Sequence, residues 1–370
     1  MKVLFFITGL GYGGAETETV NLAYELKKRG HEISFITIIT PYANGYETDL
    51  KNNGIPVHAL HVNEKKNLAF ALPRLMKWIK QERPDIIHAQ MYAPNIISRL
   101  LKKFSSSNYY LINTIQNTIE GGTLRKIAYR MTSGIPNFVS HVSRRGYNNY
   151  TGANLIKKET SGFIPNSVGM SSFADVKAFD FHADLNLAPG TFVFLAVARL
   201  ERQKDYPTLF KAVDSLRKMT DKPFVACIAG IGTLEKELHE QVEAMGLQQY
   251  IRFLGLRKDV PNLMKGADSF IMSSEWEGTS LSLLEAMSAS LPAVVTNAGD
   301  NEFVVIDGVN GYVSNINEAQ PFAENLKKMM ERSSGELLEM GTKSKEMAKE
   351  KFDRSRIVDR WVEEYEKRTK

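Results

Sequence analysis

Hydrophobic residues along this chain gather in short continuous runs, and stretches with helical spacing of apolar positions lie between the runs. Continuous apolar strands that alternate with amphipathic helices are typical of parallel sheets covered by helices on both faces. The pattern therefore predicts an α/β fold. The predicted strands are Val3–Thr8, Ile33–Ile39, Asp85–Ala89, Tyr109–Ile115, Phe192–Ala198, Phe224–Ala229, Ile251–Leu254, Ser269–Met272 and Ala293–Thr296. The predicted helices are Glu16–Arg29, Leu68–Gln81, Tyr206–Met219, Leu234–Met245 and Ser280–Ser288.

The same pattern predicts two Rossmann-like domains, which suits a chain of 370 residues. The periodicity stops over residues 162–189, where Gly, Pro, Ser and Asn gather, and a new strand begins at Phe192. We expect domains at 1–170 and 171–352, and a helix at 353–370 that packs back towards the first domain. Parallel sheets that face each other across a cleft would bring their strand C-terminal ends together, where open α/β sheets bind ligands.

Cysteine content and hydropathy predict a cytoplasmic protein. Cys227 is the one cysteine, so no disulfide can form within the chain, as is usual in a reducing compartment. The N-terminal apolar run ends in a glycine loop, without the cleavage site of a signal peptide, and a first strand is the better interpretation. No run approaches the roughly 18 apolar residues that a membrane-spanning helix needs.

The charge is uneven along the chain. Residues 1–165 contain 21 Lys and Arg against 11 Asp and Glu, whereas residues 166–370 contain 26 against 31. A basic amphipathic segment at 65–80 could lie on an anionic bilayer, so we predict peripheral contact with the inner face of the cell membrane. The alternative is a helix packed on its sheet with a solvated basic face. No nucleic-acid-binding module is recognisable, and nucleic acid is not an expected partner.

A glycine-rich loop, Gly9-Leu10-Gly11-Tyr12-Gly13-Gly14, follows the first predicted strand. Glycines let the backbone approach a diphosphate, and the N-terminus of the next helix favours negative charge. Nicotinamide-binding folds also need an acidic residue at the end of the second strand, where this chain has Thr40 and Pro41. That fingerprint is incomplete, and a purely structural tight turn is a further alternative.

Two cations follow the strand at 192–198. Arg199 comes directly after the strand, and Lys204 lies just before the helix that begins at Tyr206. A planar guanidinium and a compact ammonium suit two neighbouring phosphates. Arg202 lies between them, and ordinary loop charge is the alternative interpretation.

Glu277 and Glu285 flank the start of the helix predicted at 280–288. The free amides at 278–281 could hold a phosphate, because a helix N-terminus attracts anions. A carboxylate repels a phosphate, so the two glutamates should instead contact neutral hydroxyl groups. This loop is the strongest candidate site in the sequence.

Several segments, in this order and spacing, resemble the retaining family 4 glycosyltransferases of the GT-B fold, and the resemblance covers essentially the whole chain. The residues from Glu277 to Glu285 resemble the family's E-x7-E signature. The other matching segments are Gly13-Gly14-Ala15-Glu16, Lys28-Arg29-Gly30-His31-Glu32-Ile33, Pro84-Asp85-Ile86-Ile87-His88, Ile164-Pro165-Asn166-Ser167-Val168, Arg199-Leu200 with Lys204-Asp205, and Leu284-Glu285-Ala286-Met287.

The resemblance implies a role for each donor-site residue. Arg199 and Lys204 would neutralise the leaving diphosphate, Glu285 would hold the nucleotide ribose, and Glu277 would hold hydroxyl groups of the donor sugar. The implied donor-binding residues are Gly13, Gly14, Arg199, Lys204, Gly230, Gly232, Glu277, Gly278, Thr279, Ser280, Leu281 and Glu285. Such enzymes need no metal and no other cofactor, and the chain has no D-x-D motif.

The acceptor side departs from the family pattern, because Gln116 stands where many relatives have a histidine near the reacting centre. An amide can orient a hydroxyl group but cannot act as a general base. Arg199, Lys204, Glu277 and Gln116 are the expected catalytic residues. The expected acceptor-binding residues, in the first domain, are Gln116, Glu120, Gly121, Gly122 and His88.

The resemblance implies a hexosyltransferase that moves a sugar from a nucleotide diphosphate, expected to be UDP, to a lipid-linked glycan with retention of configuration. Surface polysaccharide biosynthesis is the expected setting. The second domain would bind the nucleotide sugar, and the first domain the acceptor. Three alternatives stay open: a UDP-sugar 2-epimerase of the same fold, a nicotinamide-dependent oxidoreductase, and a glycan-binding protein without catalysis.

Overall fold

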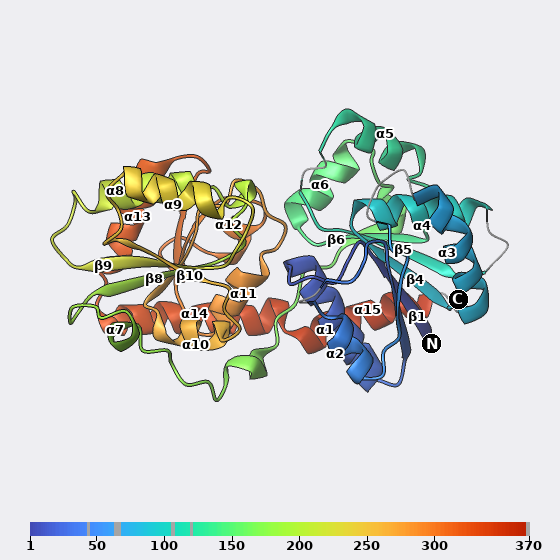
Figure 1. Ribbon diagram of the computed structural model, residues 1–370, viewed down its shortest axis with the longest axis horizontal. Helices are drawn as coiled ribbons and strands as arrows, with labels where there is room; N and C mark the ends of the chain where they lie inside the picture. The colour runs from blue at the N-terminus through green and yellow to red at the C-terminus, as the bar shows by residue number, and fades with distance from the viewer. Residues whose placement is uncertain (43–44, 63–67, 105–107, 119–120, 368–370) are drawn as a thin grey trace. The chain divides into compact units, whose positions relative to one another are not determined.

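A computed structural model describes residues 1–42, 45–62, 68–104, 108–118 and 121–367, and side-chain surroundings for these residues except 68–71. The chain forms two compact units (Figure 1). Unit 1 combines Met1–Asn166 with Ser355–Lys370, and unit 2 is Ser167–Arg354. The first unit therefore ends four residues before the expected limit at 170, and it includes the C-terminal segment.

The described part of unit 1 holds a seven-stranded parallel sheet in the order β3-β2-β1-β4-β5-β6-β7. Its strands are β1 (Lys2–Ile7), β2 (Glu32–Thr37), β3 (Val57–Ala59), β4 (Ile86–Gln90), β5 (Tyr110–Ile115), β6 (Phe138–His141) and β7 (Ser161–Phe163). Its helices are α1 (Gly14–Lys28), α2 (Glu47–Asn52), α3 (Leu68–Glu82), α4 (Tyr92–Phe104), α5 (Thr123–Met131), α6 (Arg144–Gly152), the 3-10 helix η2 (Lys158–Thr160) and α15 (Arg354–Glu366).

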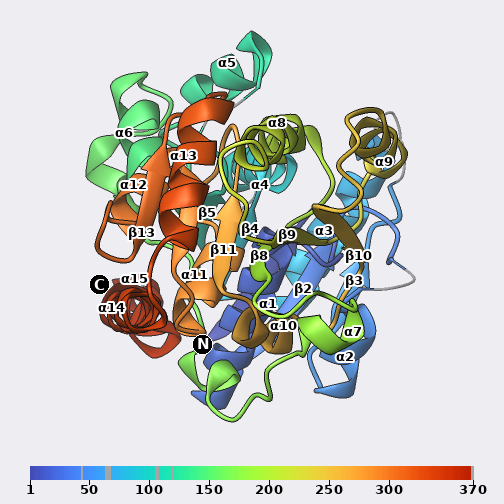
Figure 2. The same cartoon turned by 90° about the vertical axis from the view of Figure 1, so that its left-hand side faces the viewer.

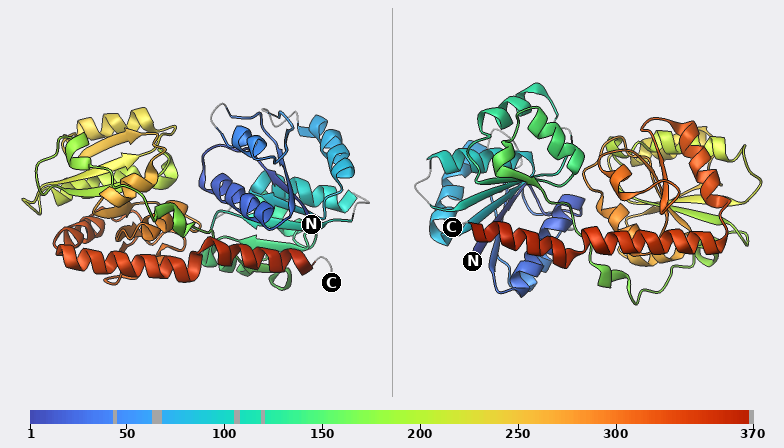
Figure 3. Two further views of the ribbon diagram at one scale, coloured as in Figure 1. Left: turned by 90° about the horizontal axis from the view of Figure 1, so that it is seen from below. Right: turned by 180° about the vertical axis from the view of Figure 1, so that it is seen from behind.

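Both faces of this sheet are buried, because successive side chains of a strand point to opposite sides. Val3 and Phe5 of β1 join a core with α1, α2 and α15, whereas Leu4 and Phe6 join a second core with α3 and α4. Figure 3 shows α15, in red, along the sheet face that also carries α1. A smaller core around Tyr129 unites α5, α6 and the end of β5.

The described part of unit 2 holds a six-stranded parallel sheet in the order β10-β9-β8-β11-β12-β13. Its strands are β8 (Phe192–Val197), β9 (Phe224–Ala229), β10 (Ile251–Gly255), β11 (Ser269–Met272), β12 (Ala293–Thr296) and β13 (Gly311–Ser314). Its helices are η3 (Met170–Phe173), α7 (Phe181–Asp184), η4 (Arg202–Lys204), α8 (Tyr206–Leu216), α9 (Glu235–Ala244), α10 (Val260–Gly266), α11 (Leu281–Ser288), α12 (Asn301–Val304), α13 (Ala319–Met330) and α14 (Ser334–Phe352).

Helices cover both faces of the second sheet as well (Figure 2). Apolar residues of α8, α9 and α13 pack on one face, and those of α10 and α11 pack on the other. Cys227 is fully buried in this second core, and burial raises the pKa of its thiol to about 12. The predicted architecture, two α/β units with parallel sheets, is confirmed.

The strands β3, β6, β7 and β13 were missed by the sequence patterns. Each has three or four residues with at most two consecutive apolar residues, whereas β11 and β12, also four residues long, each contain three in a row and were predicted. β7 also extends into the region 162–189, where we expected the periodicity to stop. Its partner β6 supplies the hydrogen bonds that hold it in the sheet.

Candidate active site

Two loops of unit 2 meet at the carboxyl edge of its sheet. β8 and β11 are neighbours in the sheet and run in parallel, so their C-terminal ends lie side by side. The loop after β8 carries Arg199 and Lys204, and the loop after β11 carries Glu277. The sheet thus brings together cationic and acidic residues that are more than seventy positions apart in the chain.

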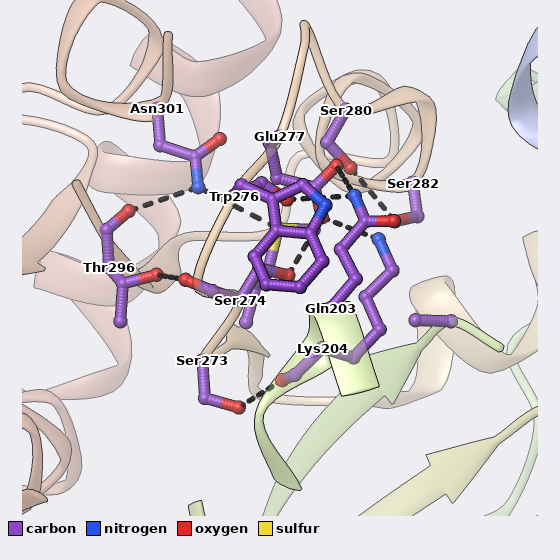
Figure 4. A network of polar contacts seen from close by, with 12 residues as sticks. Gln203, Lys204, Ser273, Ser274, Trp276, Glu277, Ser280, Ser282, Thr296 and Asn301 are labelled. Carbon is purple, nitrogen blue, oxygen red and sulfur yellow. Dashed lines mark hydrogen bonds and ion pairs between the residues drawn. The ribbon is translucent and has the colours of Figure 1, made fainter. Parts of the chain in front are cut away.

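Lys204 and Glu277 form an ion pair, with 2.5 Å between Lys204 Nζ and Glu277 Oε1 (Figure 4). Only 14% and 7% of their side-chain surfaces are exposed, so solvent screens this pair little. Ser274 Oγ donates a hydrogen bond of 2.7 Å to the same carboxylate oxygen. Gln203 Nε2 donates to Glu277 Oε2 at 3.4 Å. A buried carboxylate is therefore held by three donors from two loops.

Hydrogen bonds to backbone carbonyl groups tie the two loops together. Ser273 Oγ donates to the carbonyl oxygen of Lys204 at 2.9 Å, and the amide of Glu275 donates to the carbonyl oxygen of Gln203 at 2.9 Å. Gln203 Nε2 also donates to the carbonyl oxygen of Trp276 at 2.7 Å. Because these bonds hold both backbones, the Lys204–Glu277 geometry does not depend on one long side chain alone.

A third segment, after β12, supports the loop between β11 and α11 that carries Glu277, which we call the acidic loop. Asn301 Nδ2 donates to the carbonyl oxygen of Thr296 at 3.0 Å, and Thr296 Oγ1 donates to that of Ser274 at 2.6 Å (Figure 4). The amide of Asp300 donates to the carbonyl oxygen of Gly278 at 3.3 Å. The acidic loop is thus held from two neighbouring strand ends.

The end of β8 is held by Tyr206, the first residue of α8. Its hydroxyl group donates to the carbonyl oxygen of Ala198 at 3.2 Å. Burial, and next the negative charge of Glu277, raise the pKa of this hydroxyl, so it stays a hydrogen-bond donor. Arg199 follows directly, and its side chain is exposed. An exposed guanidinium at this edge is available to a ligand.

Gly230 and Gly232 follow β9 and lie against the loop after β8. A Cβ atom at Gly230 would collide with the carbonyl oxygen of Ala198, and one at Gly232 would collide with that of Leu200. Gly230 also has a φ of 153°, which L residues rarely adopt. Both positions need glycine for the protein's own close chain approach, whatever they do for a nucleotide base.

The start of α11 presents backbone amides beside this pair. Ser280 is the N-cap residue, but its side chain does not cap the helix, and its hydroxyl lies 3.3 Å from that of Ser282 instead. Thr279 and Ser280 are buried in the loop. Glu285 lies one turn into α11 and is half-buried. The structure thus places Glu277 in the loop and Glu285 on the helix, as the sequence predicts.

In unit 1, the glycine loop leads from β1 into α1. Gly13 is the N-cap of α1 and Gly14 its first residue, and no side chain caps the helix at Gly13. The amide of Gly13 donates to the carbonyl oxygen of Gly11 at 3.1 Å, which makes the turn tight. The phosphate contact that we expect of Gly13 and Gly14 stays a prediction.

The predicted acceptor residues fall into two groups. Gln116 follows β5 and is half-buried, and Gly121 and Gly122 are exposed before α5. Glu120 lies outside the described residues. His88 is different, because it is fully buried within β4 and both of its ring nitrogens have partners inside unit 1. The prediction that His88 contacts the acceptor is therefore corrected.

Sequence patterns missed Gln203, Ser274, Thr296 and Asn301, although all belong to the Figure 4 network. Gln203 neighbours Lys204, and Ser274 opens the acidic loop, so proximity in sequence was the one available signal. Thr296 and Asn301 lie at and after the end of β12, and only the packing of neighbouring strands brings them to the site. In the described ranges, no group of three or more His, Cys, Asp or Glu side chains could hold a metal ion.

Models of two protein families match this chain. "Glycosyltransferase Family 4" matches residues 12–152, and "Glycosyl transferases group 1" matches residues 178–350. The two matches occupy most of both units. The chain is a family 4 glycosyltransferase. The predicted family and enzyme class are confirmed, and the oxidoreductase alternative is set aside.

Characterised relatives of this glycosyltransferase have moderate sequence identity. The UDP-Gal:alpha-D-GlcNAc-diphosphoundecaprenol alpha-1,3-galactosyltransferase of Escherichia coli is 28% identical over 270 residues, 69% of either chain. The lipopolysaccharide core biosynthesis glycosyltransferase LpsE of Rhizobium meliloti is 25% identical over 369 residues, 98% of either chain. Both names describe transferases that build glycans.

A solved structure supports the fold of the glycosyltransferase. HepE of Anabaena, in complex with UDP-glucose, superimposes with a TM-score of 0.85 at 22% identity, over 98% of either chain. The order of the elements is therefore shared across the whole length. The predicted GT-B architecture is confirmed.

Proposed function

We propose that this enzyme transfers a hexose from a UDP-sugar to a lipid-linked glycan, with retention of configuration and without a metal, in surface polysaccharide biosynthesis. The observation that carries the proposal is the buried Lys204–Glu277 pair beside Arg199 and the start of α11. The names of both relatives support a glycan product, and the name of the E. coli relative supports a UDP-linked donor and a lipid diphosphate acceptor.

The Lys204 ammonium has three N–H donors, and Glu277 takes one of them. The remaining donors are open to a phosphate oxygen, so Lys204 can bind the diphosphate without releasing Glu277. Arg199 adds a second positive charge on the exposed side of the loop. Charge develops on the diphosphate as it leaves, and cations placed there in advance lower the barrier.

Glu277 contacts the donor sugar in this proposal. Because Lys204 offsets its charge, the carboxylate repels the neighbouring diphosphate less, and its oxygens still accept from neutral hydroxyl groups. The acceptor hydroxyl attacks the anomeric carbon on the face that the diphosphate leaves. The new carbon–oxygen bond forms, the bond to the diphosphate breaks, and the hydroxyl proton passes to a diphosphate oxygen.

The donor assignment is tested by hydrolysis and transfer with UDP-glucose, UDP-galactose and UDP-GlcNAc, each with and without a chelator. Lys204→Ala should lower turnover about a hundredfold or more, because it removes charge from the leaving group. Lys211→Ala, at an exposed lysine of α8, is the matched control and should leave turnover unchanged. Normal turnover in Lys204→Ala, or complete inactivation by the chelator, would contradict the proposal.

We further propose that unit 1 contacts an anionic bilayer through α5. Leu124 and Met131 are 82% and 80% exposed, and Ile127 is 43% exposed. At 100° per residue these three lie within about 60° on one face. Tyr129, which is fully buried, anchors the opposite face. Arg130 is exposed and lies about 60° from Ile127 on the same wheel, and an apolar face flanked by a basic residue suits an anionic bilayer surface.

Vesicle co-sedimentation tests this contact. The protein should pellet with vesicles that contain phosphatidylglycerol and stay in solution with pure phosphatidylcholine. Leu124→Ser with Met131→Ser should weaken binding about tenfold, because two exposed apolar side chains leave the interface. Leu338→Ser, at a 69% exposed position of α14, is the control. Equal pelleting with both vesicle types would overturn the proposal.

Across the described residues, no helix has the length and hydropathy needed to span a membrane.

A further inference from the structure

A chain of polar side chains, most of them buried, connects Tyr365 of α15 with Gln116 at the end of β5. His88 of β4 is at its centre: Nδ1 lies 2.7 Å from the hydroxyl of Tyr365, and Nε2 lies 2.7 Å from Oγ1 of Thr114. Gln90 Nε2 lies 3.4 Å from the same His88 Nε2. Gln116 Nε2 then donates to Gln90 Oε1 at 2.8 Å. All of these residues except Gln116 are buried.

The contacts select one tautomer of His88. Burial lowers the pKa of His88 to about 3, so the ring is neutral at physiological pH and has one donor and one acceptor nitrogen. The amide nitrogen of Gln90 can only donate, so the His88 Nε2 that it faces must accept. The hydroxyl groups of Thr114 and Tyr365 can serve either tautomer, whereas a proton on Nε2 would place two N–H groups against each other at the Gln90 contact. Nδ1 therefore carries the proton and donates to Tyr365.

The same orientation of Gln90 also determines how the Gln116 amide is held. Since Gln90 turns its NH2 group to His88, its carbonyl oxygen faces Gln116 and accepts from the Gln116 NH2 group. Within the part of the chain that the structure describes, no residue donates to the carbonyl oxygen of Gln116. Gln116 is half-buried at the end of β5, so this oxygen is accessible to a ligand.

We propose that Gln90 is a positioning residue, which holds the Gln116 amide so that its carbonyl oxygen accepts a hydrogen bond from the attacking hydroxyl of the acceptor. This inference rests on the proposed transfer to a glycan. Gln116 then orients the nucleophile and takes no proton, which agrees with an amide's lack of basicity. His88 acts two side chains away from the acceptor and contacts neither substrate.

Nitrogen NMR of the unmodified protein tests the tautomer without any acceptor. In protein with ¹⁵N-labelled histidine, the His88 signals, assigned by their loss in His88→Gln, should show a protonated Nδ1 and an unprotonated Nε2. The opposite tautomer would turn both amides, present the NH2 group of Gln116 and overturn the inference. This result does not depend on whether the donor or acceptor is correctly assigned.

Kinetics test the positioning role. Gln90→Met keeps the side-chain length and removes both hydrogen bonds, so the KM for a synthetic GlcNAc-diphosphate-alkyl acceptor should rise about five- to tenfold. Hydrolysis of the UDP-sugar without acceptor should stay within about twofold. Ser98→Ala is the matched control, since its buried hydroxyl group bonds to Asn95 and Asn113 and not to His88, Gln90 or Gln116. An unchanged acceptor KM in Gln90→Met would contradict the role, whereas absent UDP-sugar hydrolysis in the unmodified protein would point to the donor assignment instead.

Discussion

At the scale of single residues, Gly299 shows how closely the chain passes behind the acidic loop. Its φ is +58°, in the left-handed region, and a Cβ atom there would lie 2.5 Å from the carbonyl oxygen of Glu277. Contacts this short do not occur between real Cβ and oxygen atoms, so the loop would have to move. Because Glu277 holds Lys204, a shift of the loop would disturb both residues.

Gly299→Ala should therefore lower both stability and UDP-sugar hydrolysis, the latter about tenfold or more, because a displaced loop loses its alignment with the donor. Gly308→Ala is the matched control. Gly308 also has a left-handed φ of +72°, but a Cβ atom there would meet nothing within 4 Å. Both variants should lose about 1–2 kcal/mol from backbone strain, and only Gly299→Ala should lose activity. Equal activities, measured beside the two melting curves, would rule out a special role for Gly299.

At the scale of elements, α15 completes the core of unit 1 although it is last in the chain. Ile357, Val358, Trp361 and Tyr365 are buried among residues of β1, β2 and α1. Arg29 of α1 forms an ion pair of 2.6 Å with Asp359. That pair is partly exposed and contributes little, so apolar burial holds the helix.

Trp361→Ala should destabilise unit 1 by about 3–5 kcal/mol, because it leaves a large cavity beneath the sheet. Hydrogen exchange should accelerate in α1 and β1, which share this core. Leu338→Ala, at an exposed position of α14, should change neither stability nor exchange. If the Trp361→Ala protein unfolds at the denaturant concentration of the parent, α15 is not part of the unit 1 core in solution.

At the scale of the whole molecule, the chain divides the proposed reaction between two independent cores. The donor residues from Arg199 to Glu285 belong to unit 2, and Gln116 and α5 belong to unit 1. Each unit covers both faces of its own sheet. The excess of basic residues in 1–165 accompanies the unit proposed to contact the bilayer. The proposed transfer to a lipid-linked glycan would therefore use residues of both units, and the proposed donor binding would depend chiefly on unit 2.

The sequence by itself determined the α/β class, most of the strands, the helices α1, α3, α8, α9 and α11, and the order of the donor-site motifs, whereas α4, α13 and α14 were not predicted. These features are local, because the alternation of apolar runs and amphipathic helices can be recognised within a few residues. β3, β6, β7 and β13 escaped for the same reason, since polar residues or glycine interrupt their short apolar runs. Arg199, Lys204, Glu277 and Glu285 could be chosen because their motifs keep their spacing.

Only the tertiary structure decided which of these residues meet. Lys204 pairs with Glu277 because β8 and β11 are neighbours in the sheet, and the order of strands cannot be deduced from periodicity. His88 lies in the middle of β4 and is fully buried, because its ring packs against Trp361 and Tyr365 of α15. α15 joins unit 1 through contacts with residues more than 300 positions away, such as that between Asp359 and Arg29. Burial and pairing depend on which elements pack together, and that choice is made by the whole fold.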